Sequence, residues 1–336
     1  SDQPLLGMTI GDKFDEIVAS HGQRPALVSL HQGQRLSYSE LGAAVATLAK
    51  ALLAIGISKG ERIGIWAPNN VEWLVTQYAT AKIGAILVTI NPAYRVHELD
   101  YVLQQSGCRA LVLQNQFKTS DYEAMMLSLC PELATCEPGQ LASAAFPELT
   151  TVISMSASRH AGIYAWADLM ALAPQVSSAE LAICQARQDR DDAINIQYTS
   201  GTTGFPKGAC LSHHNILNNG YFVARAMNFS PADRLVVPVP LYHCFGMVMA
   251  NLGCLTHGAC VIYPSEAFEP EAVLRAVQAE RATALYGVPT MFIAELALPN
   301  FNAYDLTSLR TGIMAGAPCP VATMQQVNSL MHMTEV

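Results

Sequence analysis

The chain reads Tyr198-Thr-Ser-Gly-Thr-Thr-Gly-Phe-Pro-Lys-Gly208 a little past its midpoint. The residues that precede this segment, 193–197, alternate between apolar and polar side chains and predict a strand that ends in a loop. Glycines in the loop let backbone N–H groups approach an anion closely, and the Ser and Thr hydroxyls add further donors. Lys207 adds a mobile positive charge that suits phosphate. The composition of the segment therefore predicts a polyphosphate-binding loop.

This loop differs from a Walker P-loop, in which Lys directly follows Gly and is itself followed by Ser or Thr. Here Phe205 and Pro206 separate Gly204 from Lys207, and Gly208 comes next. The alternative interpretation is a glycine-rich surface turn that binds nothing. We favour a phosphate-binding loop because most of its residues suit phosphate and a predicted strand leads into it.

A helix is predicted soon after the loop. Ser212 can cap this helix, which would extend to about Met227. The loop would then lie between the end of a strand and the start of a helix, where free N–H groups stabilise anions. His213 and His214 lie at the predicted helix start, and we expect both to face solvent with no role in the site.

Strands and helices alternate along most of the chain. Before the loop, strands are expected at 62–66, 85–90 and 110–113, with helices at 70–83 and 97–105 between them. After the loop, the same alternation predicts strands at 234–238, 259–263, 283–286 and 311–315 and helices at 270–279 and 291–296. Short connections between such elements indicate parallel sheets covered by helices. No Gly-x-Gly-x-x-Gly follows the early strands, which disfavours a dinucleotide-binding fold.

The alternation predicts two interleaved α/β subdomains. Residues 58–228 would form one sheet, which carries the phosphate-binding loop, and residues 8–57 with 229–336 would form the second. A length of 336 residues agrees with about two domains. Ser37 and Glu40 are spaced as a capping box for a helix that continues to about Ile55.

Composition excludes several classes of partner. Apolar residues make up 51% of the chain and charged residues 14%, which predicts a large core and no long disordered region. The net charge is −8, from 19 basic and 27 acidic residues, and no basic cluster stands out, so we expect no nucleic-acid partner.

The cysteines and the chain start bear on location. Nine cysteines are scattered singly without a Cys-x-x-Cys pair, which indicates a reducing compartment. The N-terminus lacks the basic and apolar regions of a signal peptide, and the most apolar segment, 241–255, is too short to span a membrane. We therefore expect a cytoplasmic protein without a transmembrane segment, and we leave a homodimer open.

The phosphate-binding loop resembles the signature of the adenylate-forming superfamily, which comprises acyl-CoA synthetases, luciferases and the adenylation domains of peptide synthetases. Further segments resemble superfamily motifs and occur in the superfamily's order: 36–41, 82–92, the loop, 240–246 and 316–318. They span most of the chain, although only the loop is specific on its own. The resemblance implies an α/β fold of stacked, mostly parallel sheets covered by helices, namely the large N-terminal domain of an adenylate-forming enzyme.

The resemblance also implies roles for individual residues. It assigns ATP and phosphate binding to Thr199, Ser200, Gly201, Thr202, Thr203, Gly204, Phe205, Pro206 and Lys207. It assigns adenine binding to Gly316, Ala317 and Pro318, and the acyl and thiol site to His243, Met247 and Val288. The substrates it implies are ATP with Mg²⁺, a carboxylic acid and CoA, and no residue of this chain is assigned to the metal.

The segment 240–246 also indicates the kind of acid. Amino-acid-activating members carry an aspartate in this region to hold the substrate ammonium, and residues 242–249 contain no acid. The segment resembles instead the medium- and long-chain fatty acyl-CoA synthetases. The alternatives stay open that His243 is a core histidine and that Met247 is a core methionine.

The implied reaction is ATP-dependent formation of an acyl-AMP, followed by thioester formation with CoA. The superfamily continues after its adenine-binding turn to a Tyr-Gly-x-Thr-Glu motif, whereas Thr334 and Glu335 follow no Tyr-Gly. The ribose-binding aspartate and the catalytic lysine would lie beyond Val336. We therefore expect a truncated N-terminal portion, without the C-terminal domain and largely inactive alone, and we assign no catalytic residue.

Other functions remain as alternatives. A non-catalytic module that binds a nucleotide or an acyl group is the first of these. A peptide-synthetase adenylation domain is disfavoured by the missing aspartate, and a luciferase-type oxidation is not excluded by the motifs.

Overall fold

The computed structural model describes residues 4–158, 160–199 and 206–336. Contacts between residues group the chain into two compact units, each assembled from separate segments. The first unit comprises residues 1–12, 42–68 and 72–215, and the second comprises 13–41, 69–71 and 216–336. Residues 42–57, which we expected in the second subdomain, group with the first unit, so the exact subdomain boundaries stay a proposal.

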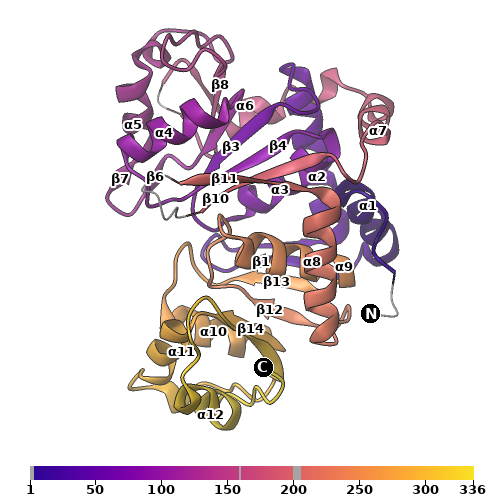
Figure 1. Cartoon of the computed structure of the whole chain (residues 1–336), viewed down its shortest axis with the longest axis vertical. Helices are drawn as coiled ribbons and strands as arrows, with labels where there is room; N and C mark the ends of the chain where they lie inside the picture. The colour runs from indigo at the N-terminus through magenta and orange to yellow at the C-terminus, as the bar shows by residue number, and fades with distance from the viewer. Residues whose placement is uncertain (1–3, 159, 200–205) are drawn as a thin grey trace. The chain divides into compact units, whose positions relative to one another are not determined.

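The first unit is built on a mostly parallel sheet with the strand order β11-β10-β4-β3-β5-β8-β9 (Figure 1). All neighbouring strands pair in parallel except β10 and β11, which are antiparallel. The strands are β3 (Arg62–Trp66), β4 (Ile86–Ile90), β5 (Ala110–Leu113), β8 (Thr151–Ser154), β9 (Ile163–Ala165), β10 (Ala193–Thr199) and β11 (Lys207–Ser212), and a separate hairpin joins β6 (Gln116–Phe117) to β7 (Ser120–Asp121).

Helices pack against this sheet because its strands are apolar on both faces. Strand residues such as Trp66 and Ile90 share one core cluster with Leu99 and Leu103 of α4 and Met126 of α5. The helices are α2 (Tyr38–Ala54), α3 (Val71–Ile83), α4 (Val96–Ser106), α5 (Tyr122–Leu129), α6 (Trp166–Met170) and α7 (Ser178–Ala186), with the 3-10 turns η1 (Pro131–Ala134) and η2 (Ala173–Gln175). The helices α1 (Ile10–His21) and α8 (His213–Ala226) contribute residues to both units, and the first residues of α2 and α3 also group with the second unit.

The second unit has its own mostly parallel sheet, with the order β15-β14-β12-β13-β1-β2. Only β1 and β2 pair antiparallel. The strands are β1 (Pro25–Ser29), β2 (Gln34–Ser37), β12 (Arg234–Val236), β13 (Cys260–Tyr263), β14 (Ala284–Gly287) and β15 (Thr311–Met314). The helical segments are the π-helix η3 (Phe245–Leu252), α9 (Gly253–His257), α10 (Pro270–Glu280), α11 (Pro289–Leu296), the 3-10 turn η4 (Phe301–Ala303) and α12 (Val321–Leu330).

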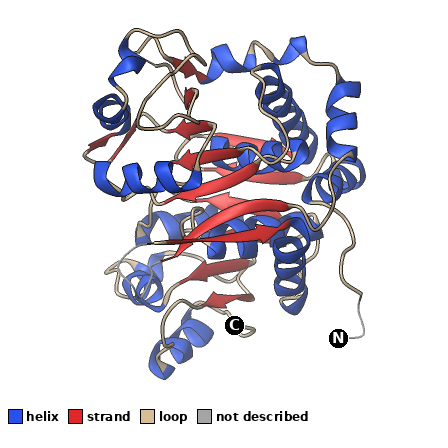
Figure 2. Ribbon diagram, turned by 45° about the horizontal axis from the view of Figure 1, so that its top comes forward, coloured by secondary structure: helices blue, strands red, loops and turns tan. Residues whose placement is uncertain are grey.

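A second apolar cluster holds this unit together. It joins strand residues such as Val236 and Leu285 to Val277 of α10, Phe292 of α11 and Val327 of α12, all of them fully buried. Figure 2 shows strands and helices of both units by type, and the helices lie against the strand layers. The predicted α/β class, with mostly parallel sheets covered by helices, is confirmed.

Local sequence patterns account for several element boundaries. Ser37 and Glu40 form the predicted capping box: the Glu40 N–H donates to Ser37 Oγ at 3.2 Å, and the Ser37 N–H donates to Glu40 Oε2 at 2.7 Å. Ser212 caps α8 as predicted, because its Oγ accepts from the Asn215 N–H at 3.2 Å. Helix α3 is buried along almost its whole length, which explains why it lacks an amphipathic pattern.

Candidate functional site

The predicted phosphate-binding loop joins two antiparallel strands of the first unit. Thr199 is the last residue of β10, and Lys207 is the first residue of β11. These two residues are register partners in the ladder, so both ends of the loop are fixed at one place. Lys207 is exposed. The six predicted phosphate-binding residues between Thr199 and Pro206 lie outside the described residues: Ser200, Gly201, Thr202, Thr203, Gly204 and Phe205.

One expectation about this loop is wrong. Helix α8 begins at His213, as the Ser212 cap predicted, but the loop does not lie between a strand end and this helix start, because β11 occupies residues 207–212 between them. Strand β11 lies at the sheet edge with mostly exposed residues, so its sequence lacks the apolar alternation of a half-buried strand. The start of α8 is therefore not the group that would stabilise an anion in this loop.

Helix α4 contacts the residue at which the loop returns to β11. The Tyr101 hydroxyl donates to the carbonyl oxygen of Pro206 at 3.1 Å, and Gln105 Nε2 donates to the Tyr101 hydroxyl oxygen at 2.9 Å. On the sheet itself, a Cβ at Gly208 would lie 3.0 Å from Ile196 Cγ2, so the two strands approach closely here. These contacts position Pro206 and Lys207.

His213 also differs from expectation. It does not face solvent: the residue is 0% exposed, and its Nδ1 accepts from the Ile10 N–H at 3.1 Å. Burial lowers the pKa of His213 to about 4, so the ring is neutral at physiological pH. The ring therefore ties the chain start to the start of α8.

The remaining predicted site residues meet at one edge of the second sheet. Strands β12, β14 and β15 are neighbours in parallel, so their carboxyl ends lie together. The segment 240–246 follows β12, Val288 follows β14, and the turn 316–318 follows β15. In α/β sheets, loops beyond the carboxyl ends of parallel strands are the usual place for a ligand.

Specific contacts connect these three loops. The Phe245 ring of η3 lies 5.3 Å, centroid to centroid, from the Tyr286 ring of β14, and the Tyr286 hydroxyl donates to the carbonyl oxygen of Met249 at 3.3 Å. Gly316 has a φ of 88°, and a Cβ built on it would lie 3.2 Å from Val288 Cγ1. The predicted adenine turn and a predicted acyl-site residue are thus close neighbours, with no room for a side chain at Gly316 unless Val288 shifts.

The other residues of this group differ in exposure. His243 is exposed, whereas Met247 is 1% exposed and packs inside the unit. Ala317 and Pro318 are exposed beside Gly316. The core interpretation of Met247 therefore stays open, and the role assigned to His243 stays a prediction.

The His243 ring has a defined hydrogen-bond orientation. Its Nδ1 accepts from the Phe245 N–H at 3.1 Å and lies 3.6 Å from Cys244 Sγ. In the neutral ring the proton is therefore on Nε2, which acts as a donor. Partial desolvation lowers the pKa of His243 from its usual value, which favours the neutral form.

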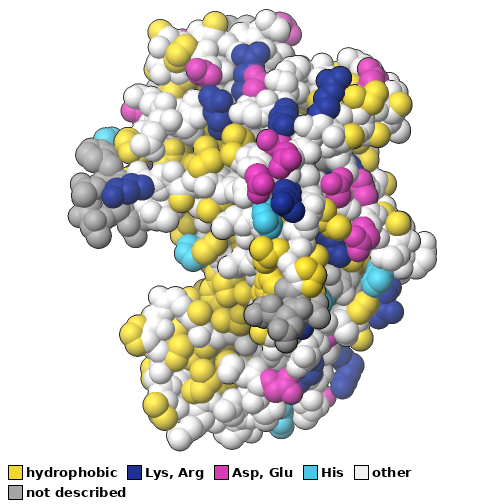
Figure 3. Space-filling view, turned by 45° about the vertical axis from the view of Figure 1, so that its right-hand side comes forward, with side chains coloured by type: hydrophobic (Ala, Val, Ile, Leu, Met, Phe, Trp, Pro, Cys, Tyr) yellow, Lys and Arg dark blue, Asp and Glu magenta, His cyan; other side chains and the backbone are white. Residues whose placement is uncertain are grey.

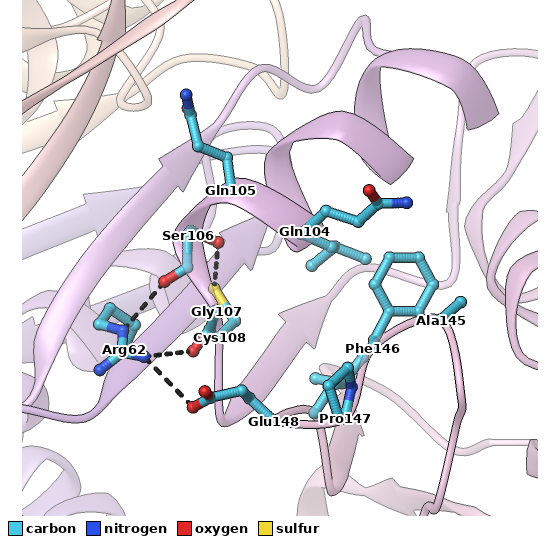
Figure 4. Close-up of a pocket in the computed structure, with 12 residues that line it drawn as sticks. Arg62, Gln104, Gln105, Ser106, Gly107, Cys108, Ala145, Phe146, Pro147 and Glu148 are labelled. Carbon is cyan, nitrogen blue, oxygen red and sulfur yellow. Dashed lines mark hydrogen bonds and ion pairs between the residues drawn. The ribbon is translucent and has the colours of Figure 1, made fainter.

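A separate cavity of about 410 Å³ lies in the first unit, away from the loop (Figure 4). Arg62 and Cys108 mark its place at the amino ends of β3 and β5, whereas the loop follows the carboxyl end of β10. The Arg62 guanidinium donates to the Ser106 and Gly107 carbonyl oxygens at 2.9 Å each, and pairs with Glu148 at 3.4 Å (Figure 4). The Arg62 guanidinium, the cationic group that lines this cavity, is thus already bonded to protein groups.

Three further observations concern the described residues and one face of the surface. Within residues 4–158, 160–199 and 206–336, no three or more His, Cys, Asp or Glu side chains gather in a way that could hold a metal ion. Over the same residues, no helix is long and apolar enough to cross a membrane. On the face shown in Figure 3, Lys and Arg side chains are interspersed with Asp and Glu side chains.

Comparison of the sequence with known protein families identifies the family of this chain. The profile described as AMP-binding enzyme matches residues 14–336. The chain belongs to the AMP-binding enzyme family. The AMP-binding match covers the phosphate-binding loop, the segment 240–246 and the turn 316–318, and the predicted resemblance is thereby confirmed.

Relatives of this AMP-binding chain are named as acyl-CoA synthetases. It is 45% identical over 332 residues to the putative acyl-CoA synthetase YngI of Bacillus subtilis (strain 168), covering 99% of this chain and 60% of that protein. It is 41% identical over 340 residues to the mitochondrial medium-chain acyl-CoA ligase ACSF2 of Mus musculus, covering 100% of this chain and 55% of that protein. The chain thus spans little more than half the length of these relatives.

A solved structure shares the fold of the AMP-binding chain. The crystal structure of ATP-bound MatB from Rhodopseudomonas palustris superposes with a TM-score of 0.73 at 27% identity, over 96% of this chain and 58% of that one. The likeness covers both units described above.

Sequence reasoning missed two residues next to the candidate site. Tyr101 lies on a helix that was predicted, but nothing in its spacing pointed to Pro206. Asn69 precedes the predicted helix at 70–83 and received no role, yet its buried amide makes two hydrogen bonds to the segment before His243. Both contacts join residues more than a hundred positions apart, which no local pattern can show.

Proposed function

We propose that this chain takes part in the ATP-dependent activation of an apolar carboxylic acid, most simply a medium- or long-chain fatty acid, and in its transfer to CoA. In the first step a carboxylate oxygen attacks the α-phosphorus of ATP, an acyl-AMP forms, and pyrophosphate leaves with the electron pair of the broken P–O bond. In the second step the CoA thiolate attacks the acyl carbonyl carbon, a thioester forms, and AMP leaves.

One observation carries this proposal. The segment 240–246, Val288 and the turn 316–318 follow the carboxyl ends of three adjacent parallel strands. The Phe245 and Tyr286 rings pack together, and Val288 lies beside Gly316. An exposed glycine turn and an apolar wall next to a hydrogen-bond donor suit a flat base and an acyl group. The relatives named as acyl-CoA synthetases support the same reaction class.

The chain's own residues take the following roles in the proposal. The loop from Thr199 to Lys207 holds the β- and γ-phosphates and the departing pyrophosphate, and Gly316, Ala317 and Pro318 hold adenine. His243 donates from Nε2 to the acyl carboxylate or carbonyl oxygen, while Met247 and Val288 form part of the acyl wall. Mg²⁺ enters with ATP, and we assign it no residue among those described.

The absence of charge in one segment supports the proposed substrate class. Residues 242–249 carry no carboxylate, so a substrate ammonium would have no partner there. A fatty acid presents only methylenes beyond its carboxylate, which suits this segment. The name of the mouse relative points to medium chain length.

Thermal unfolding of this chain with ligands tests the proposal. We would add Mg-ATP, and then non-hydrolysable acyl-adenylate analogues of rising chain length, and record the melting temperature. A ligand at a hundred times its Kd stabilises the folded state by about 2.7 kcal/mol, which shifts Tm by several degrees.

A shift that peaks at one acyl chain length would support fatty-acid activation and give the preferred length. Stabilisation by ATP alone would favour a nucleotide-binding module that does not recognise an acyl group. A shift with an aminoacyl-adenylate analogue, but none with fatty acyl analogues, would overturn the substrate class. The cytoplasmic location and the homodimer stay open.

A further inference from the structure

Asn69, which lies just before α3, bridges two peptide groups of the segment that leads to His243. The residue is 2% exposed. Its Nδ2 donates to the carbonyl oxygen of Val239 at 2.9 Å, and its Oδ1 accepts from the Leu241 N–H at 2.9 Å. The two peptide groups flank Pro240, which has no N–H of its own. The side-chain amide of Asn69 carries a donor and an acceptor on one planar group, whereas an ionised aspartate has no donor and a leucine has neither.

The segment fixed by Asn69 is in turn coupled to His243. The His243 N–H donates to the carbonyl oxygen of Pro240 at 3.3 Å. A Cβ at Gly246 would lie 2.6 Å from the same oxygen, so the first turn of η3 packs directly on the Pro240 carbonyl. The Pro240 carbonyl oxygen is therefore closely packed by backbone atoms of His243 and Gly246. A shift of Pro240 must displace residues 243–246.

The turn then fixes the imidazole. The Gly246 and Met247 N–H groups donate to the His243 carbonyl oxygen at 3.0 Å each, and the Phe245 N–H donates to Nδ1 at 3.1 Å. Because Nδ1 accepts a hydrogen bond, Nε2 carries the proton and faces away from the turn that holds Nδ1.

We propose that Asn69 is a positioning residue for His243, which fixes the segment 239–241 so that His243 presents Nε2–H as a hydrogen-bond donor. The group it would recognise is the acyl carboxylate or carbonyl oxygen of the substrate. The hydrogen bonds that connect Asn69 to His243 do not depend on the proposed function. Only the identity of the group that accepts from Nε2 rests on it. Asn69 itself touches neither the acid nor the nucleotide in this proposal.

The test compares Asn69→Asp with a matched control in this chain. Asn69→Asp keeps the shape and the acceptor for Leu241, but it removes the donor and sets a carboxylate oxygen against the Val239 carbonyl. The control, Thr256→Val, removes a buried hydroxyl in the same unit, which donates to the Gly253 carbonyl oxygen at 2.9 Å and lies 3.0 Å from His257 Nδ1. Both proteins would be labelled with ¹⁵N-histidine, the His243 ring signals assigned with His243→Gln, and the affinities for Mg-ATP and for an acyl-adenylate analogue measured by calorimetry.

In the wild-type chain we expect ring shifts of a neutral imidazole protonated at Nε2. In Asn69→Asp we expect these signals to move or broaden, and the Kd for the acyl-adenylate analogue to rise about tenfold, the loss of roughly one hydrogen bond to a ligand. The Kd for Mg-ATP should change less than twofold. Thr256→Val should leave the His243 signals and both affinities unchanged.

Two results would overturn the proposal. The first is a folded Asn69→Asp protein with unchanged His243 signals. The second is that neither Asn69→Asp nor Asn69→Ser folds although Thr256→Val does, because the amide would then hold the fold and not the imidazole. If the wild-type chain binds no acyl-adenylate analogue, the proposed function fails, but the ring signals still decide the role of Asn69.

Discussion

The Tyr101 hydroxyl donates to the carbonyl oxygen of Pro206 at 3.1 Å, so α4 is hydrogen-bonded to the residue at which the predicted phosphate-binding loop returns to the sheet. The bond joins a helix on the sheet face to the residue before Lys207, and Gln105 supports it from one helical turn away. Helix α4 therefore helps to position the backbone of Lys207.

Loss of this bond should weaken nucleotide binding. Tyr101→Phe removes the neutral hydrogen bond to Pro206, worth about 1 kcal/mol, together with the one that the hydroxyl accepts from Gln105. We expect the Kd for Mg-ATP to rise several-fold with little change in melting temperature. Calorimetric titration measures this. The control is Tyr304→Phe, which removes an exposed hydrogen bond to Glu271 in the second unit and should leave the Kd unchanged. Equal affinities of Tyr101→Phe and wild type would show that α4 does not position the loop.

Removal of the Lys207 charge should have a larger effect. A hydrogen bond to a charged group is worth about 1.5–3 kcal/mol, so we expect Lys207→Met to raise the Kd for Mg-ATP roughly 10- to 100-fold. The Kd for AMP, which lacks the β- and γ-phosphates, should change much less. Lys118→Met, at another exposed lysine of the first unit, is the control. An equal loss for ATP and AMP would contradict the assigned role.

His213 should make stability depend on acid pH. Its pKa is about 4 in the folded chain and about 6.5 when unfolded, so the unfolded state gains a proton first as pH falls. The stability is fully present above pH 6.5 and is lost as the pH falls from about 6.5 to 4, by at most about 3 kcal/mol.

His213→Gln keeps an acceptor for the Ile10 N–H but cannot be protonated. We expect its free energy of unfolding, from urea titrations at several pH values, to fall less than that of the wild type between pH 6.5 and 4. His214→Gln is the neighbouring control, since His214 is only partly buried. Parallel pH curves for wild type and His213→Gln would show that the ring is protonated without cost.

A charge cluster in the second unit should also contribute to stability. Glu280 accepts from Arg35 and Arg234 at 2.5–2.8 Å and is 7% exposed, and its bond to Arg35 is the main cause of a lowered pKa. Glu280→Gln should cost roughly 2 kcal/mol, less than a fully buried pair because the Arg35 side chain is largely exposed.

The same cluster also predicts that stability falls at acid pH. The cause differs from that at His213: ion pairing favours the charged form of Glu280, whereas burial favours the neutral form of His213. A carboxylate with a lowered folded-state pKa contributes stability above its unfolded pKa, and loses it as pH falls through the folded value. We expect the difference in unfolding free energy between wild type and Glu280→Gln to shrink below about pH 4.5. Glu271→Gln, part of an exposed pair with Arg275, should show almost no difference at any pH.

Local patterns predicted the elements that are fixed by local causes. The alternation of strands and helices gave the α/β class, and the Ser37–Glu40 spacing gave a helix start, because neither depends on distant residues. Strand β11 was missed because it is an exposed edge strand, whose residues need no apolar alternation to pair with β10.

Distant contacts set the limit of prediction for the site. His213 was expected in solvent because helix starts are commonly exposed, and only the fold brings Ile10 against its ring. Asn69 and Tyr101 were missed for the same reason, since their partners lie 170 and 105 residues away. Loop composition could indicate phosphate, but it could not show which helix holds the loop.

The π-helix η3 has a consequence for how this site could change in evolution. The Gly253 N–H donates to the carbonyl oxygen of Val248, five residues back, as in a π-turn and not an α-turn. Such a segment carries one residue more per hydrogen-bonded turn than an α-helix. A single-codon deletion within 245–252 would allow α-helical bonding to resume, and every side chain before the deletion, His243 included, would rotate relative to the residues behind it. Length variation, and not only substitution, would thus change where His243 lies at this edge of the sheet.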